Sequence, residues 1–171
     1  MERSGEGTFY GHAELGARLA DSLLARLRFA TATRMRVVHL IREHMFDYRP
    51  QWSDAALRRF VRRVGAEHIA DLFDLRIADA LGNGTRGPDV GKLKAMARRI
   101  DRVVEAGTAL SVRDLAVDGR HVMLELGLPP GPEVGRVLED LLEQVLEDPS
   151  LNTRERLLGK LHARRDSARR P

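Results

Sequence analysis

The chain has 171 residues, of which 29 are basic and 25 acidic, and its formal net charge is +4. This length suits one domain of ordinary size or two small helical domains that share a core. Cysteine is absent and no apolar run approaches the roughly 20 residues that cross a bilayer, so we exclude disulfides, thiolate metal sites and membrane spans and expect a cytoplasmic protein.

Four helices are predicted in the first half of the chain. In each of them apolar residues recur three and four positions apart, which is the period of a helix with one buried face. Thr33 can cap the second helix and Ser53 the third, while the fourth runs from about Glu67 and stops by Gly82. The apolar face of the first helix consists of Leu15, Leu19, Leu23, Leu24 and Leu27.

The third predicted helix separates apolar from basic side chains. Its inward positions are Ala56, Leu57, Phe60, Val61 and Val64. Its outward positions are Arg58, Arg59, Arg62 and Arg63. We interpret these arginines as a solvated helix face, with contact to phosphate as the alternative.

A loop at residues 82–87 separates the first four helices from the rest of the chain. Its glycines, interspersed with Asn83, Thr85 and Arg86, are typical of a connection between periodic segments. We therefore predict two domains, 1–84 and 85–171. A fifth helix follows the loop, and its basic cluster is a candidate for phosphate contact. This cluster consists of Lys92, Lys94, Arg98, Arg99 and Arg102.

A glycine-rich turn, Gly127 to Gly135, precedes a long amphipathic helix. Pro132 suits the first helical position because a missing N–H costs nothing there. The apolar face of the helix consists of Val134, Val137, Leu138, Leu141, Leu142, Val145 and Leu146. Two interpretations of the turn remain open. The N–H groups of Gly131, Val134 and Gly135 can meet a phosphate at the positive helix end, or the glycines allow two helices to pack closely.

The last predicted helix, capped by Asn152 or Thr153, lies in a strongly basic segment. Residues 152–171 hold seven basic and two acidic side chains, a net charge of +5. Its candidates for contact with nucleic acid include Arg154, Arg156, Lys160, Arg164 and Arg165. Since no segment shows the alternation of a strand, we predict an all-α bundle of about eight to nine helices.

His12, His44 and Asp79 form a candidate metal site, because they fall on predicted helices that could converge. Imidazole and carboxylate groups are suitable ligands for a divalent metal. The alternative is that these side chains cap helices or form hydrogen bonds in the core. The sequence contains no phosphate-binding loop, nucleophile elbow or zinc signature. The acid pairs on the long helix, Glu139-Asp140 and Glu147-Asp148, are expected to be solvated.

Two groups of motifs resemble the bacterial CCA-adding tRNA nucleotidyltransferases and their poly(A) polymerase relatives. The resemblance covers roughly Phe9 to Leu158. The first group consists of Phe9-Tyr-Gly-His12, Gly16-Ala17, Ile41-Arg-Glu-His-Met45, Trp52-Ser-Asp-Ala55, Arg58-Arg-Phe60 and Leu75-Arg-Ile-Ala-Asp79. The second group consists of Asp114-Leu115, Asp118-Gly119, Leu126-Gly-Leu-Pro-Pro-Gly-Pro132, Val134-Gly135, Leu138, Leu141-Leu142, Pro149 and Asn152.

This resemblance implies that 1–84 is the end of an HD-type helical domain and that 85–171 is the family's C-terminal helical domain. The family's catalytic head, with its Gly-Ser pair and metal-binding Asp-x-Asp, has no counterpart here, and neither has the His-Asp doublet of the HD site. We therefore expect no cofactor on this chain, because the magnesium ions of the family belong to the head. Only His12, His44 and Asp79 match remaining positions of the HD site.

The function implied by the resemblance is binding of tRNA or other structured RNA without catalysis by this chain alone. Shape and phosphate recognition of an A-form stem requires basic side chains and exposed N–H groups. One alternative is an HD-type metal-dependent phosphohydrolase acting on nucleotides. Another is a structural subunit that pairs with a separate catalytic head or with itself, since an interrupted bundle leaves apolar surface uncovered.

Overall fold

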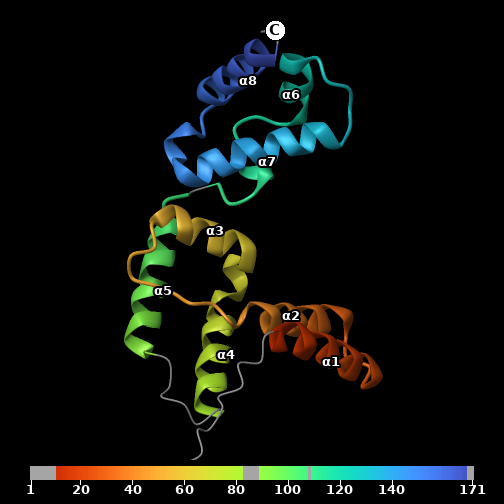
Figure 1. Ribbon diagram of the computed structural model, residues 1–171, viewed down its shortest axis with the longest axis vertical. Coiled ribbons are helices and arrows are strands. Elements are labelled where there is room, and N and C mark those ends of the chain that lie inside the picture. Colours follow the sequence, from red (N-terminus) through yellow and green to blue (C-terminus); the bar gives the residue numbers. More distant parts are fainter. Residues whose placement is uncertain (1–10, 83–88, 108, 169–171) are drawn as a thin grey trace, which may run out of the picture. The chain divides into compact units, whose positions relative to one another are not determined.

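The computed structural model describes residues 11–82, 89–107 and 109–168. Within these ranges the chain is entirely helical, as predicted, with eight α-helices and three short 3₁₀ helices (Figure 1). The α-helices are α1 (His12–Arg26), α2 (Thr31–Glu43), α3 (Asp54–Val64), α4 (Ile69–Gly82), α5 (Val90–Glu105), α6 (Gly119–Leu126), α7 (Pro132–Glu147) and α8 (Arg154–Ala168). The 3₁₀ helices are η1 (Ala66–His68), η2 (Val112–Asp114) and η3 (Pro149–Leu151).

The chain forms two compact units. One comprises Met1–Arg49 and Val64–Lys94, and the other comprises Pro50–Arg63 and Ala95–Pro171. The division passes through α3 and α5, whereas the boundary predicted at 84/85 lies outside the described residues. No helix of the described chain is long and apolar enough to cross a membrane.

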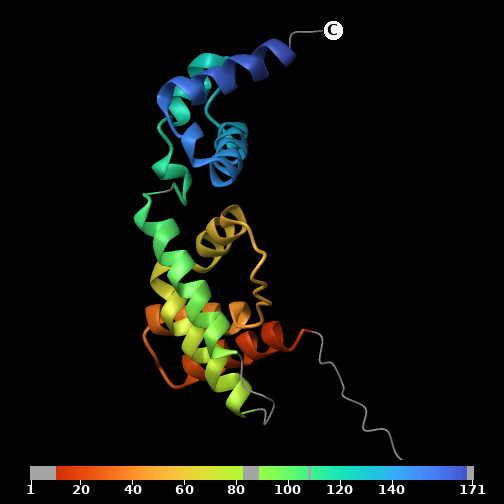
Figure 2. The same ribbon diagram turned by 90° about the vertical axis from the view of Figure 1, so that its left-hand side faces the viewer.

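In the first unit α1 and α2 form a helical hairpin, and α2 also packs against α4 (Figures 1 and 2). The His39 ring bonds the Val64 carbonyl at 2.7 Å, which fixes the end of α3 relative to α2. Phe46 stacks on Phe73 at 5.8 Å between ring centroids. The α2 helix begins at Thr31 and has Ala30 as its N-cap, so the prediction that Thr33 caps it was wrong.

The apolar face predicted for the first helix is mostly exposed. Leu15, Leu19, Leu23 and Leu27 are 46–63% exposed, whereas Ala17 is fully buried and Leu24 half-buried. Helical period alone shows that apolar side chains share a face, but it does not show that another element covers that face. We refer to these four exposed leucines as the α1 leucine stripe.

The core of the second unit is organised by α7, whose observed start and apolar face agree with the sequence prediction. Pro132 occupies the first turn, and all seven apolar residues predicted to face inward are buried. They pack with Val122 of α6 and with Leu157 and Leu161 of α8. Burying each such side chain stabilises a fold by about 1.5–3 kcal/mol.

The connection between α7 and α8 is fixed by Asn152. Its side chain accepts a hydrogen bond from the Ala116 N–H at 2.8 Å and donates to the Asp114 carbonyl at 2.9 Å. Thr153 Oγ1 accepts from the Arg156 N–H at 3.3 Å and therefore caps α8. Of the two predicted caps, only Thr153 has that role.

Candidate nucleic-acid interface

The basic cluster predicted on α5 contains exposed cations without ion pairs and cations that contact other residues of the chain. Lys94, Arg98 and Arg102 are exposed and form no ion pair with any residue that the structure describes. Lys92 lies 3.7 Å from Asp89 in the first turn of the helix. Phosphate oxygens need N–H donors that are not already engaged. Lys94 and Arg98 meet this requirement, and Arg102 retains its Nη donors because only its Nε donates, to the Arg98 carbonyl at 3.4 Å.

Arg99 is different, because it ties α5 to the segment before α3. Its guanidinium donates to the carbonyls of Pro50 at 3.1 Å and Trp52 at 2.7 Å, and to Asp54 Oδ1 at 2.7 Å. The hydrogen bond from Arg99 lowers the pKa of the Asp54 carboxyl below its ordinary value. Arg99 was predicted to contact RNA, but its described contacts are with the fold itself.

Close packing of helices does not require glycine at positions 131 and 135 of the glycine turn. A Cβ built on Gly131 or on Gly135 meets no atom within 4 Å, and Gly131 has an extended φ of 167°. Of these three glycines only Gly127, the C-cap of α6, lies in the left-handed region, with a φ of 67°. The Val134 N–H already donates to the Gly131 carbonyl at 3.2 Å, and the Val134 side chain is buried. Of the three predicted backbone donors, Gly131 and Gly135 are the exposed ones.

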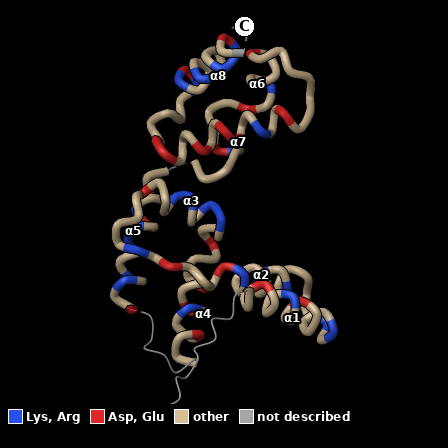
Figure 3. Tube along the Cα trace, viewed as in Figure 1, with Lys and Arg blue, Asp and Glu red and all other residues tan. Residues whose placement is uncertain are grey.

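The α8 helix carries the other predicted cations. Arg156 donates to the Ser150 carbonyl at 3.0 Å, and Arg164 pairs with Asp140 of α7 at 2.7 Å. Arg154 and Lys160 are exposed and form no ion pair with the residues described. Figure 3 shows the clustering of basic residues on α8. We refer to Lys94, Arg98, Arg102, Arg154 and Lys160 together as the unpaired cations.

The arginines of α3 correct the prediction of a solvated face. Arg58 is 9% exposed; its Nε donates to the Leu146 carbonyl at 2.6 Å and its Nη2 to the Glu147 carbonyl at 3.1 Å. These carbonyls lie at the C-terminus of α7, where a cation complements the helix dipole.

The neighbouring arginines form a ladder of ion pairs with one face of α7. Arg59 contacts Glu143 and Glu147, each at 3.0 Å, and Arg62 contacts Glu143 at 2.6 Å and also pairs with Glu139. Figure 3 shows the basic residues of α3 and the acidic residues along α7. The glutamates of the predicted acid pairs therefore join α7 to α3. Sequence reasoning missed this because each charge run was assessed alone.

Some exposed cations were not predicted as candidates, among them Arg120 and Arg136. Arg120 of α6 and Arg136 of α7 form no ion pair within the part of the chain that the structure describes. Arg136 directly follows Gly135, so its position beside the glycine turn was a usable signal in the sequence.

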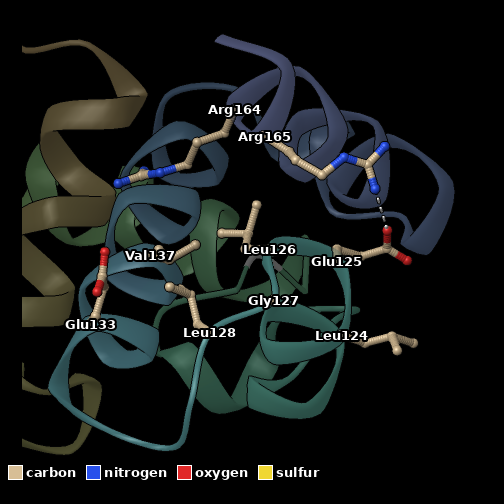
Figure 4. A pocket seen from close by; sticks show the side chains of 9 residues that line it. All are labelled: Leu124, Glu125, Leu126, Gly127, Leu128, Glu133, Val137, Arg164 and Arg165. Carbon is tan, nitrogen blue, oxygen red and sulfur yellow. Dashed lines mark ion pairs between the residues drawn. The ribbon is translucent and has the colours of Figure 1, made fainter. Parts of the chain in front are cut away.

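A pocket of about 370 Å³ opens between the end of α6, the start of α7 and the second half of α8. Its apolar lining comes from Leu126, Leu128 and Val137, with Arg164 and Arg165 at its rim (Figure 4). Because the residues from α8 are far from the others in the sequence, no local sequence pattern predicts the pocket.

The candidate metal ligands are only partly brought together. The rings of His12 and His44 lie 5.7 Å apart between centroids, and Nδ1 of His44 bonds the Ile41 carbonyl at 2.6 Å. Asp79 lies 3.6 Å from Arg76. Among the residues described, no group of three or more histidine or acidic side chains could hold a metal ion. The His44 hydrogen bond is compatible with the alternative that these side chains cap helices or form hydrogen bonds in the core.

The described part of the chain is thus all-helical, with arginines of α3 paired to glutamates of α7 and with exposed cations on α5 and α8. Residues 12–161 match the family tRNA nucleotidyltransferase domain 2, and the chain belongs to this family. No solved structure matches the chain.

Two curated proteins are similar to most of the chain. The A-adding tRNA nucleotidyltransferase of Deinococcus radiodurans is 36% identical over 146 residues, which are 82% of this chain and 32% of that protein. The CC-adding tRNA nucleotidyltransferase of Thermus thermophilus is 39% identical over 143 residues, 84% of this chain and 31% of that protein. The chain thus spans about a third of the length of these relatives. The family resemblance derived from the motifs is confirmed.

Proposed function

We propose that this chain binds tRNA or another structured RNA and that it does not transfer nucleotides by itself. The observation that carries the proposal is the set of unpaired cations in a chain of the tRNA nucleotidyltransferase family. Both relatives are named for the addition of nucleotides to tRNA. Exposed lysines and arginines without carboxylate partners retain their full attraction for the phosphate backbone.

The glycine turn adds support to this proposal. Gly131 is the exposed N-cap of α7, at the helix end where the dipole favours an anion. Shape and phosphate recognition of this kind suits an A-form stem, whose deep groove hides the base edges from side chains.

The test is a titration of fluorescently labelled tRNA with the chain at about 50 and about 200 mM salt. If the five unpaired cations each contact a phosphate, affinity falls about five-hundredfold between these concentrations. Absence of binding at the lower salt concentration would overturn the proposal.

Double variants assign the binding to particular residues. Arg154→Ala/Lys160→Ala on α8 is expected to weaken binding and to reduce the slope of log affinity against log salt by about two. The matched control is Arg42→Ala/Arg49→Ala, which also removes two positive charges. These two arginines are paired with Glu14 and Asp47. Equal losses in both double variants would contradict the assignment to the unpaired cations.

The α1 leucine stripe favours a second candidate function, that of a structural subunit for a separate catalytic head. Four leucines that are 46–63% exposed along one helix form an apolar surface of the kind that marks protein contacts. The part of the relatives outside the matched third is the occupant that we propose for this surface.

Co-purification with a separately expressed catalytic head of the Thermus relative tests this candidate. Leu19→Asp/Leu23→Asp is expected to abolish the association, because charged side chains cannot be buried unpaired in an apolar contact. Leu124→Asp on α6, where the native leucine is 81% exposed, is the control and should leave association intact. Failure of the unsubstituted chain to associate would remove this candidate.

A further inference from the structure

The pocket between α6, α7 and α8 combines an apolar floor with charges of both signs. Leu126 at the end of α6, Leu128 in the turn after it and Val137 of α7 line the pocket. Leu124 lies at its edge and is 81% exposed (Figure 4). Its volume of about 370 Å³ is at the lower end of the range of small-ligand sites. A pocket of this size accommodates one nucleobase rather than a helix or a peptide.

Arg165 forms two long ion pairs but no hydrogen bond with either carboxylate. Its guanidinium pairs with Glu125 at 3.8 Å and with Asp166 at 3.6 Å, and both distances are beyond hydrogen-bond range (Figure 4). Glu125 instead bonds His162 at 2.6 Å. In Figure 4 the side chains of Arg164 and Arg165 extend in opposite directions above Leu126. The guanidinium N–H groups of Arg165 that these long ion pairs leave without a hydrogen bond could donate to an anionic group at this rim.

Glu133 supplies an acceptor at the pocket. Its carboxylate is exposed and forms no ion pair with any residue in the described part of the chain. A carboxylate repels phosphate but accepts hydrogen bonds from amino groups, such as those on adenine, cytosine and guanine. The site therefore suits a ligand with a flat apolar face, an N–H donor and an anionic group.

An unstacked nucleotide has these three properties together. In this arrangement the base face would lie on the leucines, the exocyclic amino group would contact Glu133 and the phosphate would contact Arg165. We propose that the α6–α8 pocket binds one unstacked nucleotide of a bound RNA, with preference for a base that carries an exocyclic amino group. This inference rests on the proposed RNA binding, and it adds a base-recognising site to phosphate contact.

The first experiment measures the affinity of labelled tRNA for the native chain and for pocket variants. Arg165→Gln and Glu133→Gln are each expected to weaken binding about tenfold, the loss of one charge-assisted hydrogen bond. Glu155→Gln, at an exposed position of α8 away from the pocket, is the control for a changed charge and should leave affinity unchanged. Melting curves of each variant verify the fold, and Glu133→Gln removes no described contact.

The second experiment uses short labelled oligonucleotides of adenosine, cytidine or uridine alone. The native chain is expected to bind the adenosine and cytidine oligonucleotides several-fold more tightly than the uridine one, because uracil has no amino group. Glu133→Gln should remove this preference. Competition with free adenosine or cytidine monophosphate distinguishes the source of the ligand, and complete displacement by these at low concentration would overturn the assignment to RNA.

The outcomes separate the two proposals. If tRNA binds but neither pocket variant changes the affinity, the pocket inference is wrong and the proposed RNA binding stands. If the oligonucleotides bind without base preference, the role of Glu133 is wrong. If no RNA binds the native chain, the proposed function itself fails, and the pocket inference fails with it.

Discussion

Gly127 and Gly135 lie in the same turn but have different conformational requirements. Gly127 has a positive φ of 67°, which only glycine adopts readily. Gly135 lies in the first turn of α7, and a Cβ there meets no atom within 4 Å. Opposite effects of alanine are therefore expected at the two positions.

Gly127→Ala is expected to lower the free energy of unfolding by about 1 kcal/mol because alanine is strained at positive φ. Gly135→Ala is expected to raise it by about 0.5–1 kcal/mol through helix propensity. Urea unfolding followed by circular dichroism measures both values. A similar loss at both positions would show that the turn tolerates no side chain.

Asp54 gives a prediction for the effect of pH on stability. The hydrogen bond from Arg99 lowers the pKa of Asp54 in the folded chain below its ordinary value of about 3.9. A carboxyl group whose pKa is lower in the folded than in the unfolded chain stabilises the fold at pH values above its ordinary pKa. This stabilisation is lost as the pH falls through the lowered pKa of the folded chain.

The difference in Tm between the native chain and Asp54→Asn should therefore be constant above about pH 5 and shrink below about pH 4. Thermal melts across this range measure it. Asp101→Asn, which removes an exposed carboxylate of α5, is the charge-matched control. A difference that stays unchanged to the lowest pH would show that the Asp54 charge does not contribute.

At the scale of elements, α3 is joined to α7 by two kinds of contact. Arg58 is buried and satisfies backbone carbonyls at the end of α7. Arg59 is 43% exposed in its side chain and forms ion pairs with glutamates that are also partly exposed. Solvent weakens the second kind far more than the first.

Arg58→Ala is expected to destabilise the chain by about 2–3 kcal/mol, because it leaves the helix end without its donors. Arg59→Ala should cost less than about 1 kcal/mol and lose its effect in high salt. Unfolding by urea at low and high salt separates them. Equal costs with equal salt dependence would contradict the distinction between buried and exposed contacts.

At the scale of the whole molecule, the proposed lack of catalysis by this chain alone can be tested together with the proposed RNA binding. The chain alone is expected to add no nucleotide to tRNA, since phosphoryl transfer depends on acidic residues that hold metal ions. Added to the full-length Thermus relative, it should slow nucleotide addition by sequestering tRNA, and excess tRNA should restore the rate. Inhibition that excess tRNA does not relieve would point to another mechanism.

The sequence by itself determined the helices and the family. The start of α7 at Pro132 and its seven buried positions follow from local chemistry, because proline placement and helical period depend only on near neighbours. The family motifs also lie within short segments. Both kinds of signal are available without knowledge of how the helices pack.

Only the tertiary structure decided what each helix face contacts. Arg62 pairs with Glu143, 81 positions away, Arg99 holds the segment before α3, and the α1 leucine stripe is left exposed. The pocket of α6, α7 and α8 likewise joins three segments. A periodic pattern shows which side chains share a face, but the partner of that face is set by packing between distant segments, which the local sequence does not encode.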